Sequence, residues 1–390
     1  MRFCRSYAKL NCIVARGVLK KDCFGNLFSQ LEQRNHRSVE YMDGFVKNAS
    51  SNQLPDWVRK AWHGDMILLL GASGYIGRTV ASELRRRGHC FIPLTRRAFD
   101  YTRFDYLFDY LRTMRPIFLV NAASYEISLG GTVAEGEREK MMAANAILPQ
   151  MIARVCLMTK TSWGHLSSGS VYCGAKVMGN GKPAVRRRLG DSETLELFDK
   201  HPEKFQGFTE LDEPNFSFRY PSCNFYSGTK ALAEEAIQDI GQSYIWRLRL
   251  PFNEREESCN WLWQMHRQAE VTDGINSCSH LEDCVRACLD LWEMRAPFGT
   301  YNVTNPGAIT MGRAAREMRR VLHTPVRVRT GGEETAPSGC ILDCGKLLRA
   351  GVKLRPVEEA VEDCLDRLRV SARGIRSVEA APKIFPAGAL

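Results

Sequence analysis

The sequence lacks the cysteine pairs that build zinc sites and disulfide frameworks. Its 14 cysteines include no C-x-x-C pair. The closest spacings, Cys284/Cys288 and Cys340/Cys344, have no histidine partners at zinc-finger distances. We therefore expect reduced thiols in an intracellular protein, and no metal site.

A long hydrophobic run and a strongly basic body are also missing. No window of 18 apolar residues exists, so no membrane span is expected. The net charge of +10 lies mainly in residues 1–64, which hold 11 Lys/Arg against 5 Asp/Glu, whereas the rest of the chain carries 43 against 39. Because the body of the chain is nearly balanced, a nucleic-acid partner is not expected.

The N-terminus has a charge bias of its own. The first 21 residues carry six basic residues and no acidic one, which resembles a mitochondrial presequence. A disordered extension, or an upstream start codon before a protein that begins near Met66, explains the same pattern. We expect a cytoplasmic protein, with a mitochondrial location as the alternative.

A glycine loop organises the chain that follows. Met66–Leu70 is a short apolar run that predicts a buried parallel strand. Gly71, Gly74 and Gly77 then fall at the spacing G-x-x-G-x-x-G, before a helical pattern. They permit, in turn, a tight turn, close approach of a pyrophosphate and close packing of the helix on the sheet. The helix N-terminus suits an anion, so the segment predicts dinucleotide binding.

From residue 66 onward, strands and helices alternate, which is typical of an α/β protein with a doubly wound parallel sheet of Rossmann type. The expected strands are 66–70, 90–94, 117–120, 163–168, 244–250 and 300–304, and the expected helices are 75–87, 102–114, 136–159, 225–240, 281–294, 310–322 and 356–369. Residues 174–224, rich in Gly, Pro and charge, predict a long irregular insertion.

These elements suggest a division into domains. We expect a basic N-terminal extension at 1–64 and a Rossmann domain at 66–252 that contains the insertion. A smaller substrate-binding region at 253–371 is interleaved with the last Rossmann elements, and 372–390 forms a loose tail.

The end of the second strand bears on the choice of cofactor. In a dinucleotide fold an acid there holds the ribose 2′-OH, whereas an arginine accommodates a 2′-phosphate. Here the sequence reads Thr95-Arg96-Arg97, with no acid. Guanidinium groups clamp phosphate oxygens in a bidentate manner. The sequence therefore predicts NADP(H), with NAD possible; the alternative is that these arginines only decorate a surface loop.

A tyrosine and a lysine supply candidate chemistry. Tyr226 and Lys230 are four residues apart on one predicted helix, so they share a face. An unperturbed tyrosine has a pKa of about 10, and a nearby ammonium lowers it towards the working range. Ser168, at a strand end, can hydrogen-bond a carbonyl oxygen and polarise it as hydride arrives. Alone, Tyr-x-x-x-Lys is a common surface pair; after the glycine loop, the turn at 121–123 and the Ser-Ser strand end it becomes specific.

In this order the motifs resemble the extended short-chain dehydrogenase/reductase family, of the NAD-dependent epimerase/dehydratase superfamily, over about residues 66–369. Within it the chain is most similar to the deoxysugar-nucleotide reductases: dTDP-4-dehydrorhamnose reductases and the reductase half of UDP-4-keto-6-deoxyglucose 3,5-epimerase/4-reductases. The segments that carry this resemblance are 207–210, 213–216, 225–231, 247–251 and 301–307.

The resemblance implies an NAD(P)H-dependent reductase of a nucleotide-linked 4-keto-6-deoxysugar. It implies a catalytic set of Ser168, Tyr226 and Lys230, with Asn145 as a possible fourth member in a proton relay. The residues expected to bind cofactor, besides Tyr226 and Lys230, are Gly71, Ser73, Gly74, Tyr75, Ile76, Gly77, Arg96, Arg97, Asp100, Asn121, Ala122 and Ala123. Substrate contacts are expected of Asn224, Arg247 and Arg249, for which ion pairs and helix caps are the alternative.

Three further expectations follow from the resemblance. Relatives often pair through the helix that bears Tyr-x-x-x-Lys, so a homodimer is expected. The bifunctional relatives use a cysteine for epimerisation where this chain has Ala134, so epimerisation by that route is not expected. Two other functions stay open: an epimerase or dehydratase that retains its NAD(P), and a non-catalytic regulatory subunit with the same fold.

Overall fold

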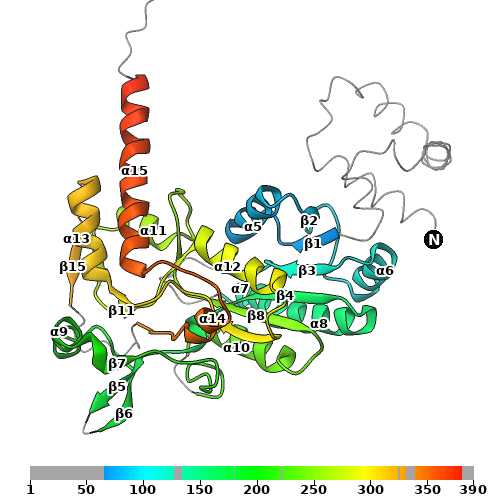
Figure 1. Ribbon diagram of the computed structural model, residues 1–390, viewed down its shortest axis with the longest axis horizontal. Coiled ribbons are helices and arrows are strands. Elements are labelled where there is room, and N and C mark those ends of the chain that lie inside the picture. Colours follow the sequence, from blue (N-terminus) through cyan, green and yellow to red (C-terminus); the bar gives the residue numbers. More distant parts are fainter. Residues whose placement is uncertain are drawn as a thin grey trace, which may run out of the picture. The chain divides into compact units, whose positions relative to one another are not determined.

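The computed structural model describes residues 66–126, 134–179, 181–220, 223–323, 326–330 and 339–379, with side chains described as far as Arg369 (Figure 1). The chain divides into two compact units. The first comprises the chain up to Ser167, Cys223–Trp246 and Pro297–Thr300; the second comprises Ser168–Ser222, Arg247–Ala296 and the chain from Tyr301. The predicted extension at 1–64, with its presequence-like start, lies outside the described residues. The predicted insertion falls mostly in the second unit, whereas the sequence placed it in the Rossmann domain.

The first unit is built on a six-stranded sheet. Its order is β2-β1-β3-β4-β8-β13, from β1 (Met66–Leu70), β2 (Cys90–Leu94), β3 (Phe118–Asn121), β4 (Ser162–Ser168), β8 (Ser243–Leu248) and β13 (Gly299–Asn302). The first strand pairs in parallel with β2 and β3, and β3 pairs in parallel with β4. Every residue of β1 is buried, as its continuous apolar run predicts. The predicted Rossmann-type sheet is confirmed.

Helices alternate with these strands. They are α5 (Tyr75–Arg86), α6 (Phe104–Met114), α7 (Glu135–Met142), α8 (Leu148–Thr159) and α10 (Phe225–Ile237), and a π-helical turn, η2 (Ala143–Ile147), joins α7 to α8. Contacts join α8 to both α6 and α10. The core beneath them draws residues from strands and helices alike, among them Leu68, Leu107, Ile152, Trp163 and Ile245.

Among the described residues, one helical run, from α7 to α8, is notable for its length and apolar composition. Glu135–Thr159 is long and apolar enough to cross a membrane by length and composition, with a mean hydropathy of 1.4 over its best window, but half of that window is buried inside the molecule. Ile152, Val155 and Cys156 lie in the core of the first unit. Burial in the core therefore accounts for the apolar composition of this helix.

Residues 175–179 and 181–206 of the second unit are folded, which corrects the prediction of an irregular insertion. Strand β5 (Ala175–Gly179) pairs antiparallel with β6 (Lys182–Arg186) and with β7 (Phe205–Gln206). Helix α9 (Ser192–Lys200) and a 3₁₀ turn, η4 (Pro202–Lys204), lie between them in sequence. The small hydrophobic core of this segment includes Ala175, Leu189, Phe198 and Phe205. Strand β6 is exposed and contains a proline, so it lacks the apolar alternation that marks a strand.

The rest of the second unit combines short strand pairs with helices. The pairs are β9 (Pro251–Phe252) with β12 (Ser279–His280), β10 (Glu270–Thr272) with β15 (Arg327–Arg329), and β11 (Ile275–Asn276) with β14 (Ile309–Thr310). The helical elements are η3 (Gly169–Val171), α11 (Trp261–Arg267), α12 (Leu281–Glu293), α13 (Met311–Leu322), α14 (Gly345–Arg349) and α15 (Val357–Glu379).

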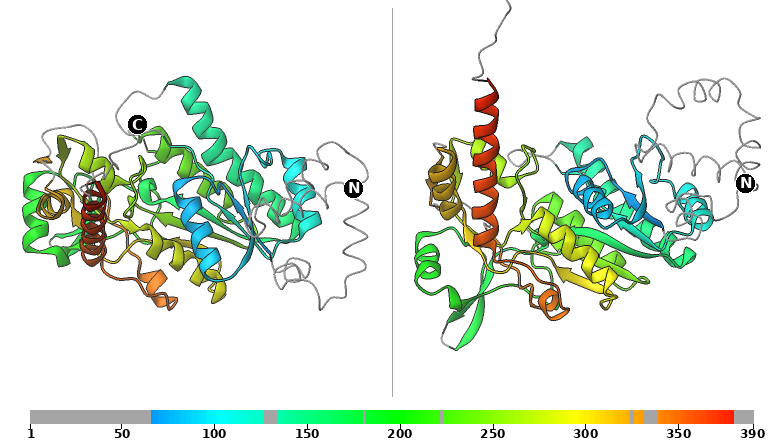
Figure 2. Two further views of the ribbon diagram at one scale, coloured as in Figure 1. Left: turned by 90° about the horizontal axis from the view of Figure 1, so that it is seen from above. Right: turned by 45° about the horizontal axis from the view of Figure 1, so that its top comes forward.

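Helices α13 and α15 lie side by side (Figures 1 and 2). Their facing sides bury Met318, Val321, Val361 and Leu365 in the core of the second unit. The sequence predicted α12, α13 and α15, but α15 continues into the region predicted to be a loose tail. All cysteines within the described residues are free, and most are buried.

Candidate active site

The glycine loop forms the tight turn that its sequence predicts. Gly71 has a φ of +73°, and a Cβ on Gly77 would lie 2.1 Å from the carbonyl oxygen of Gly71. The N-cap of α5 is Gly74, which offers no side-chain cap. The first turn of α5 therefore presents amide groups that its own cap does not cover, and this arrangement binds an anion well.

The remaining predicted loop residues differ in exposure. Ser73 is exposed, Tyr75 is buried and Ile76 is half-buried. Arg78, just beyond the loop, donates from Nη1 to the carbonyl oxygen of Ser73 at 2.6 Å. A cation therefore lies beside the loop, where it favours a negatively charged group.

The turn after β3 lies against the glycine loop. A Cβ on Gly71 would lie 2.5 Å from the amide nitrogen of Ala123, and the amide of Ala122 donates to the carbonyl of Leu70 at 3.0 Å. Asn121 accepts from the amide of Ala123 at 3.1 Å. The strand order reverses between β1 and β3, so the two turns meet where open α/β sheets bind their ligands.

We expect Gly71→Ala to abolish binding of the predicted dinucleotide and to lower the melting temperature. The alanine would have to adopt a left-handed backbone, which costs about 1–2 kcal/mol, and its Cβ would meet the backbone of Ala123 at 2.5 Å. Gly88→Ala is the matched control, because Gly88 has a φ of +72° but nothing within 4 Å of its Cβ position. Fluorescence titration with NADPH and thermal melts measure both effects. If Gly71→Ala and Gly88→Ala lose the same amount of NADPH affinity and melting temperature, the close approach of Gly71 to Ala123 does not matter.

The segment predicted to bind a 2′-phosphate follows β2 and forms a turn at the surface. Arg96 and Arg97 are exposed and make no hydrogen bond or ion pair in the described part of the chain. Asp100 accepts from the amide of Thr102 at 3.2 Å and from its hydroxyl. Tyr101, which sequence reasoning missed, is buried near the backbone of Gly71. Burial raises the pKa of Tyr101, so its phenol stays neutral.

Helix α10 brings Tyr226 and Lys230 together. Lys230 Nζ lies 5.8 Å from the centroid of the Tyr226 ring. The lysine is 1% exposed, and its Nζ donates to the carbonyl oxygen of Leu166 at 3.3 Å. Burial lowers the pKa of Lys230 to about 8, against the opposing influence of Glu126 and Glu234. Near neutral pH the phenol therefore has an ammonium beside it.

Glu234 extends the buried face of α10 by one turn. It is 3% exposed and accepts a hydrogen bond from the hydroxyl of Ser167 in β4. Together with the bond from Lys230 to Leu166, this contact joins α10 to the end of β4. The sequence signal for Glu234 is its position four residues after Lys230, which places both side chains on the same face of the helix.

Ser168 is the last residue of β4. Its Oγ accepts from the amide of Ser170 at 3.2 Å, and the side chain is half-buried. It directly follows Ser167, which bonds Glu234. Ser168 belongs to the second unit, whereas Tyr226 belongs to the first. Their convergence on one substrate stays a prediction.

Asn145 lies in the π-helical turn and is fully buried. Its Oδ1 accepts from the amide of Tyr125 at 2.8 Å and from Ser124 Oγ at 3.1 Å. Its Nδ2 donates to the carbonyl of Tyr125 at 2.8 Å and lies 3.5 Å from Thr229 Oγ1. The side chain thus holds the segment after β3 close to α10, and its proposed part in a proton relay stays a prediction.

The predicted substrate contacts have partners within the protein. Asn224 is the N-cap of α10 and accepts from the amide of Ser227 at 2.8 Å. Arg247 Nη1 donates to the hydroxyl of Tyr172 at 2.9 Å. Arg249 Nη2 donates to Asn276 Oδ1 at 2.9 Å, whereas its Nε is buried without a hydrogen-bond partner. Among the described residues, Arg249 Nε is thus a buried donor without a partner.

Tyr172 and His165 are further residues that sequence reasoning did not assign. The Tyr172 ring stacks on Phe208 with centroids 4.8 Å apart. His165, in β4, is fully buried and lies 3.1 Å through Nδ1 from Asn121 Nδ2. Burial and the nearby Lys230 hold the pKa of His165 well below its usual value, so it is neutral.

Known proteins resemble most of this chain. A family model described as RmlD substrate binding domain matches residues 65–370. The dTDP-4-dehydrorhamnose reductase of Mycolicibacterium smegmatis is 23% identical over 316 residues, which is 77% of this chain and 84% of that protein. A trifunctional UDP-glucose 4,6-dehydratase/UDP-4-keto-6-deoxy-D-glucose 3,5-epimerase/UDP-4-keto-L-rhamnose-reductase of Arabidopsis thaliana is 22% identical over 245 residues, which is 62% of this chain and 32% of that protein. The chain spans only about a third of the length of such trifunctional relatives.

Solved structures share the fold. The UDP-rhamnose synthase of Acanthamoeba polyphaga mimivirus has a TM-score of 0.64 at 16% identity, covering 77% of this chain and 99% of that one. A Bacillus anthracis dTDP-4-dehydrorhamnose reductase in complex with NADP has a TM-score of 0.59 at 19% identity, covering 79% and 99%. MoeE5 in complex with UDP-glucose and NAD has a TM-score of 0.56 at 15% identity, covering 78% and 99%. The neighbours thus include one that binds NADP and one that binds NAD.

Proposed function

The chain belongs to the RmlD substrate binding domain family, and from that membership we propose that it is an NADPH-dependent reductase of a nucleotide-linked 4-keto-6-deoxysugar. It is homologous to dTDP-4-dehydrorhamnose reductase, an NAD(P)-dependent oxidoreductase. The observation that carries the proposal is the buried ammonium of Lys230 beside the Tyr226 ring, on a helix joined to the end of β4.

The glycine loop fits a dinucleotide. Side chains on Gly71 and Gly77 would fill the space in which the backbone turns, and α5 begins there without a side-chain cap. A dinucleotide whose pyrophosphate lay over this loop would supply the hydride from its nicotinamide. The exposed Arg96 and Arg97, with no acid beside them, support NADPH as the preferred form.

The protein's own residues would manage the proton. Tyr226 gives its phenolic proton to the oxygen of the substrate ketone as negative charge develops on it. The Lys230 ammonium stabilises the phenolate that remains. Ser168 donates a hydrogen bond to the same substrate oxygen and so stabilises the developing charge. The names of the relatives include UDP-4-keto-6-deoxy-D-glucose and dTDP-4-dehydrorhamnose, which are nucleotide-linked 4-keto-6-deoxysugars.

The substrate is identified by a screen of the purified full chain. UDP-, dTDP- and GDP-4-keto-6-deoxyhexoses are offered with NADPH or NADH, and oxidation is followed by the loss of the reduced-nicotinamide absorbance. We expect stoichiometric NADPH consumption with one of these sugars, and slower reaction with NADH. Conversion of a nucleotide sugar without net consumption would instead indicate an epimerase or dehydratase. No conversion, together with a co-purifying enzyme, would indicate a regulatory subunit.

A further inference from the structure

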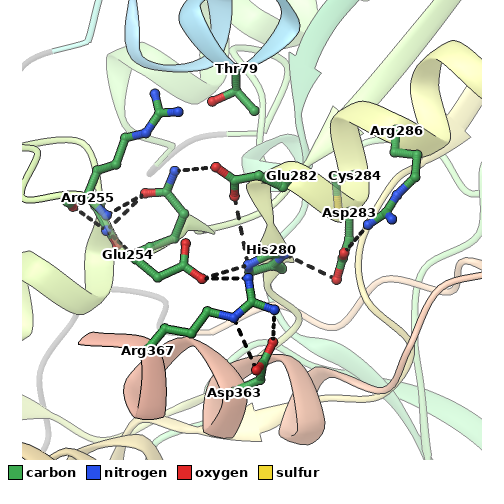
Figure 3. Close-up of polar contacts among 12 residues, drawn as sticks. Thr79, Glu254, Arg255, His280, Glu282, Asp283, Cys284, Arg286, Asp363 and Arg367 are labelled. Atoms are coloured by element: carbon green, nitrogen blue, oxygen red, sulfur yellow. Dashed lines mark hydrogen bonds and ion pairs between the residues drawn. The ribbon is translucent and has the colours of Figure 1, made fainter. Parts of the chain in front are cut away.

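Among the described residues two carboxylates are buried, and they are held in different ways. Asp283, in α12, lies 3.1 Å from His280 Nδ1 and 2.5 Å from Arg286 Nη2 (Figure 3). Glu234, in α10, accepts a hydrogen bond from the neutral hydroxyl of Ser167 instead. A buried carboxylate is costly unless a cation compensates it. The compensating charge for Glu234 is therefore expected on the buried face of α10.

Lys230 lies on that face, one helical turn before Glu234. Its side chain is buried, and its Nζ donates to the carbonyl oxygen of Leu166 at 3.3 Å. Glu234 bonds Ser167, the next residue of β4. The ammonium and the carboxylate are thus anchored to consecutive residues of one strand, in a region that excludes water. Attraction between opposite charges is strong in such a region.

The order of the two residues does not serve helix stability. A lysine four residues before a glutamate is the weaker of the two orders in an isolated helix. The residue after Glu234, Glu235, is exposed. The helix therefore turns one of two adjacent carboxylates inwards, against the cost of burying it. The charge that Glu234 brings to Lys230 accounts for that placement.

Four titratable groups of the described chain lie close to Lys230. Tyr226 and Glu234 are on its own helix, Glu126 is in the segment after β3, and His165 is in β4. Burial lowers the pKa of Lys230 to about 8, and Glu126 and Glu234 act in the opposite direction. His165 is neutral because its pKa is held well below its usual value. Glu126 is exposed, so salt screens its charge, whereas the charge of the buried Glu234 is screened much less.

We propose that Glu234 is a positioning residue of the reductase site, whose buried carboxylate keeps the Lys230 ammonium charged and in place beside the phenol of Tyr226. This role rests on the proposed function, since Lys230 stabilises a phenolate only in that reaction. Without the carboxylate, the ammonium would lose its proton at a lower pH, and the phenolate would lose its stabilising neighbour within the working range. Glu234 thus acts through Lys230 rather than on the substrate.

A titration of Lys230 tests this role without any substrate. In the full chain labelled with ¹³C at the lysine ε-carbons, the Lys230 resonance is the one that Lys230→Met lacks. At about 0.5 M salt, which screens Glu126, we expect a wild-type midpoint near pH 8. Glu234→Gln keeps an oxygen that can accept from Ser167 but removes the charge, so the midpoint should fall by roughly one pH unit. Glu235→Gln, the exposed neighbour, is the matched control and should keep the wild-type midpoint.

The pH dependence of turnover gives a second measurement. In Glu234→Gln the basic limb of kcat should move from about pH 8 to about pH 7. Turnover should then fall roughly fivefold at about pH 8 and change little at about pH 6, with KM within a few fold of the wild type. A loss of packing would lower turnover at both pH values alike. Glu234→Asp, which restores the charge, should recover the basic limb.

An unchanged Lys230 midpoint in a Glu234→Gln protein that melts as a folded chain would overturn the proposal. If that variant does not fold, Ser167→Ala decides. It keeps the carboxylate and removes only its hydrogen bond, so the Lys230 midpoint should not fall; a fall of about one pH unit there would show that the strand contact, rather than the charge, governs Lys230. A lowered midpoint in Glu234→Gln with no sugar reduced in the screen would support the effect on Lys230 and reject the proposed function.

Discussion

Tyr226→Phe is expected to lower turnover by about 10²–10⁴-fold, because the reaction loses the group that delivers the proton to the developing alkoxide. The substitution removes one hydroxyl and keeps the ring, so its contact with Lys230, whose Nζ lies 5.8 Å from the centroid, is preserved. NADPH binding should stay within a few fold, since the glycine loop is untouched. Steady-state kinetics with the sugar found in the screen, together with an NADPH titration, measure the two quantities.

The control for this variant is Tyr106→Phe. Tyr106 is 45% exposed on α6 and has no assigned part in the chemistry. It should retain full turnover. If Tyr226→Phe also retains it, the proton comes from another group, and the proposed mechanism is wrong. If both turnover and NADPH binding collapse, the hydroxyl is needed to seat the cofactor rather than to transfer a proton.

The second large effect is expected from Lys230→Met, which replaces the ammonium by an apolar chain of similar length. Without the cation the phenolate of Tyr226 is not stabilised, so turnover should fall by about 10²–10⁴-fold. Wild-type turnover should decline as pH rises through about 8, where Lys230 loses its proton. In Lys230→Met that decline should be absent. Lys200→Met, on the exposed face of α9, is the matched control.

The same variant should be at least as stable as the wild type. The folded-state pKa of Lys230, about 8, is below its ordinary value of 10.5, so burying the ammonium costs free energy. That cost is fully present below pH 8 and fades as pH rises towards 10.5. Removing it is worth on the order of 3 kcal/mol at neutral pH, less the hydrogen bond to Leu166 that is lost. An inactive and strongly destabilised Lys230→Met would mean that this lysine serves packing rather than chemistry.

The sequence predicted the elements whose signals are local. The glycine loop could be predicted because its glycines are required by the local backbone. A Cβ on Gly71 or Gly77 would collide with backbone atoms. The apolar run of β1 needs no distant partner to be recognised. The pairing of Tyr226 with Lys230 follows from helix periodicity alone.

Other features depend on contacts between distant segments. In the structure, the helix predicted at 136–159 contains a π-helical turn at Asn145. The sequence signal for this turn is Pro149, because proline has no amide hydrogen to donate to the carbonyl oxygen four residues before it. The sheet of residues 175–206 has an exposed strand without apolar alternation. Glu254 and His280 are 26 residues apart and meet only because β9 pairs with β12. Whether Ser168 and Tyr226 converge also depends on long-range structure, and periodicity cannot decide it.

The division of the chain into interleaved stretches has a consequence for biosynthesis. The backbone passes between the two units after Ser167, Ser222, Trp246, Ala296 and Thr300. The last strand of the six-stranded sheet, β13, ends at Asn302, so a ribosome must release more than three quarters of the polypeptide before that sheet can close. No single cut yields an intact half, and a nascent chain stalled before residue 299 would expose the unpaired edge of β8 to chaperones or to aggregation.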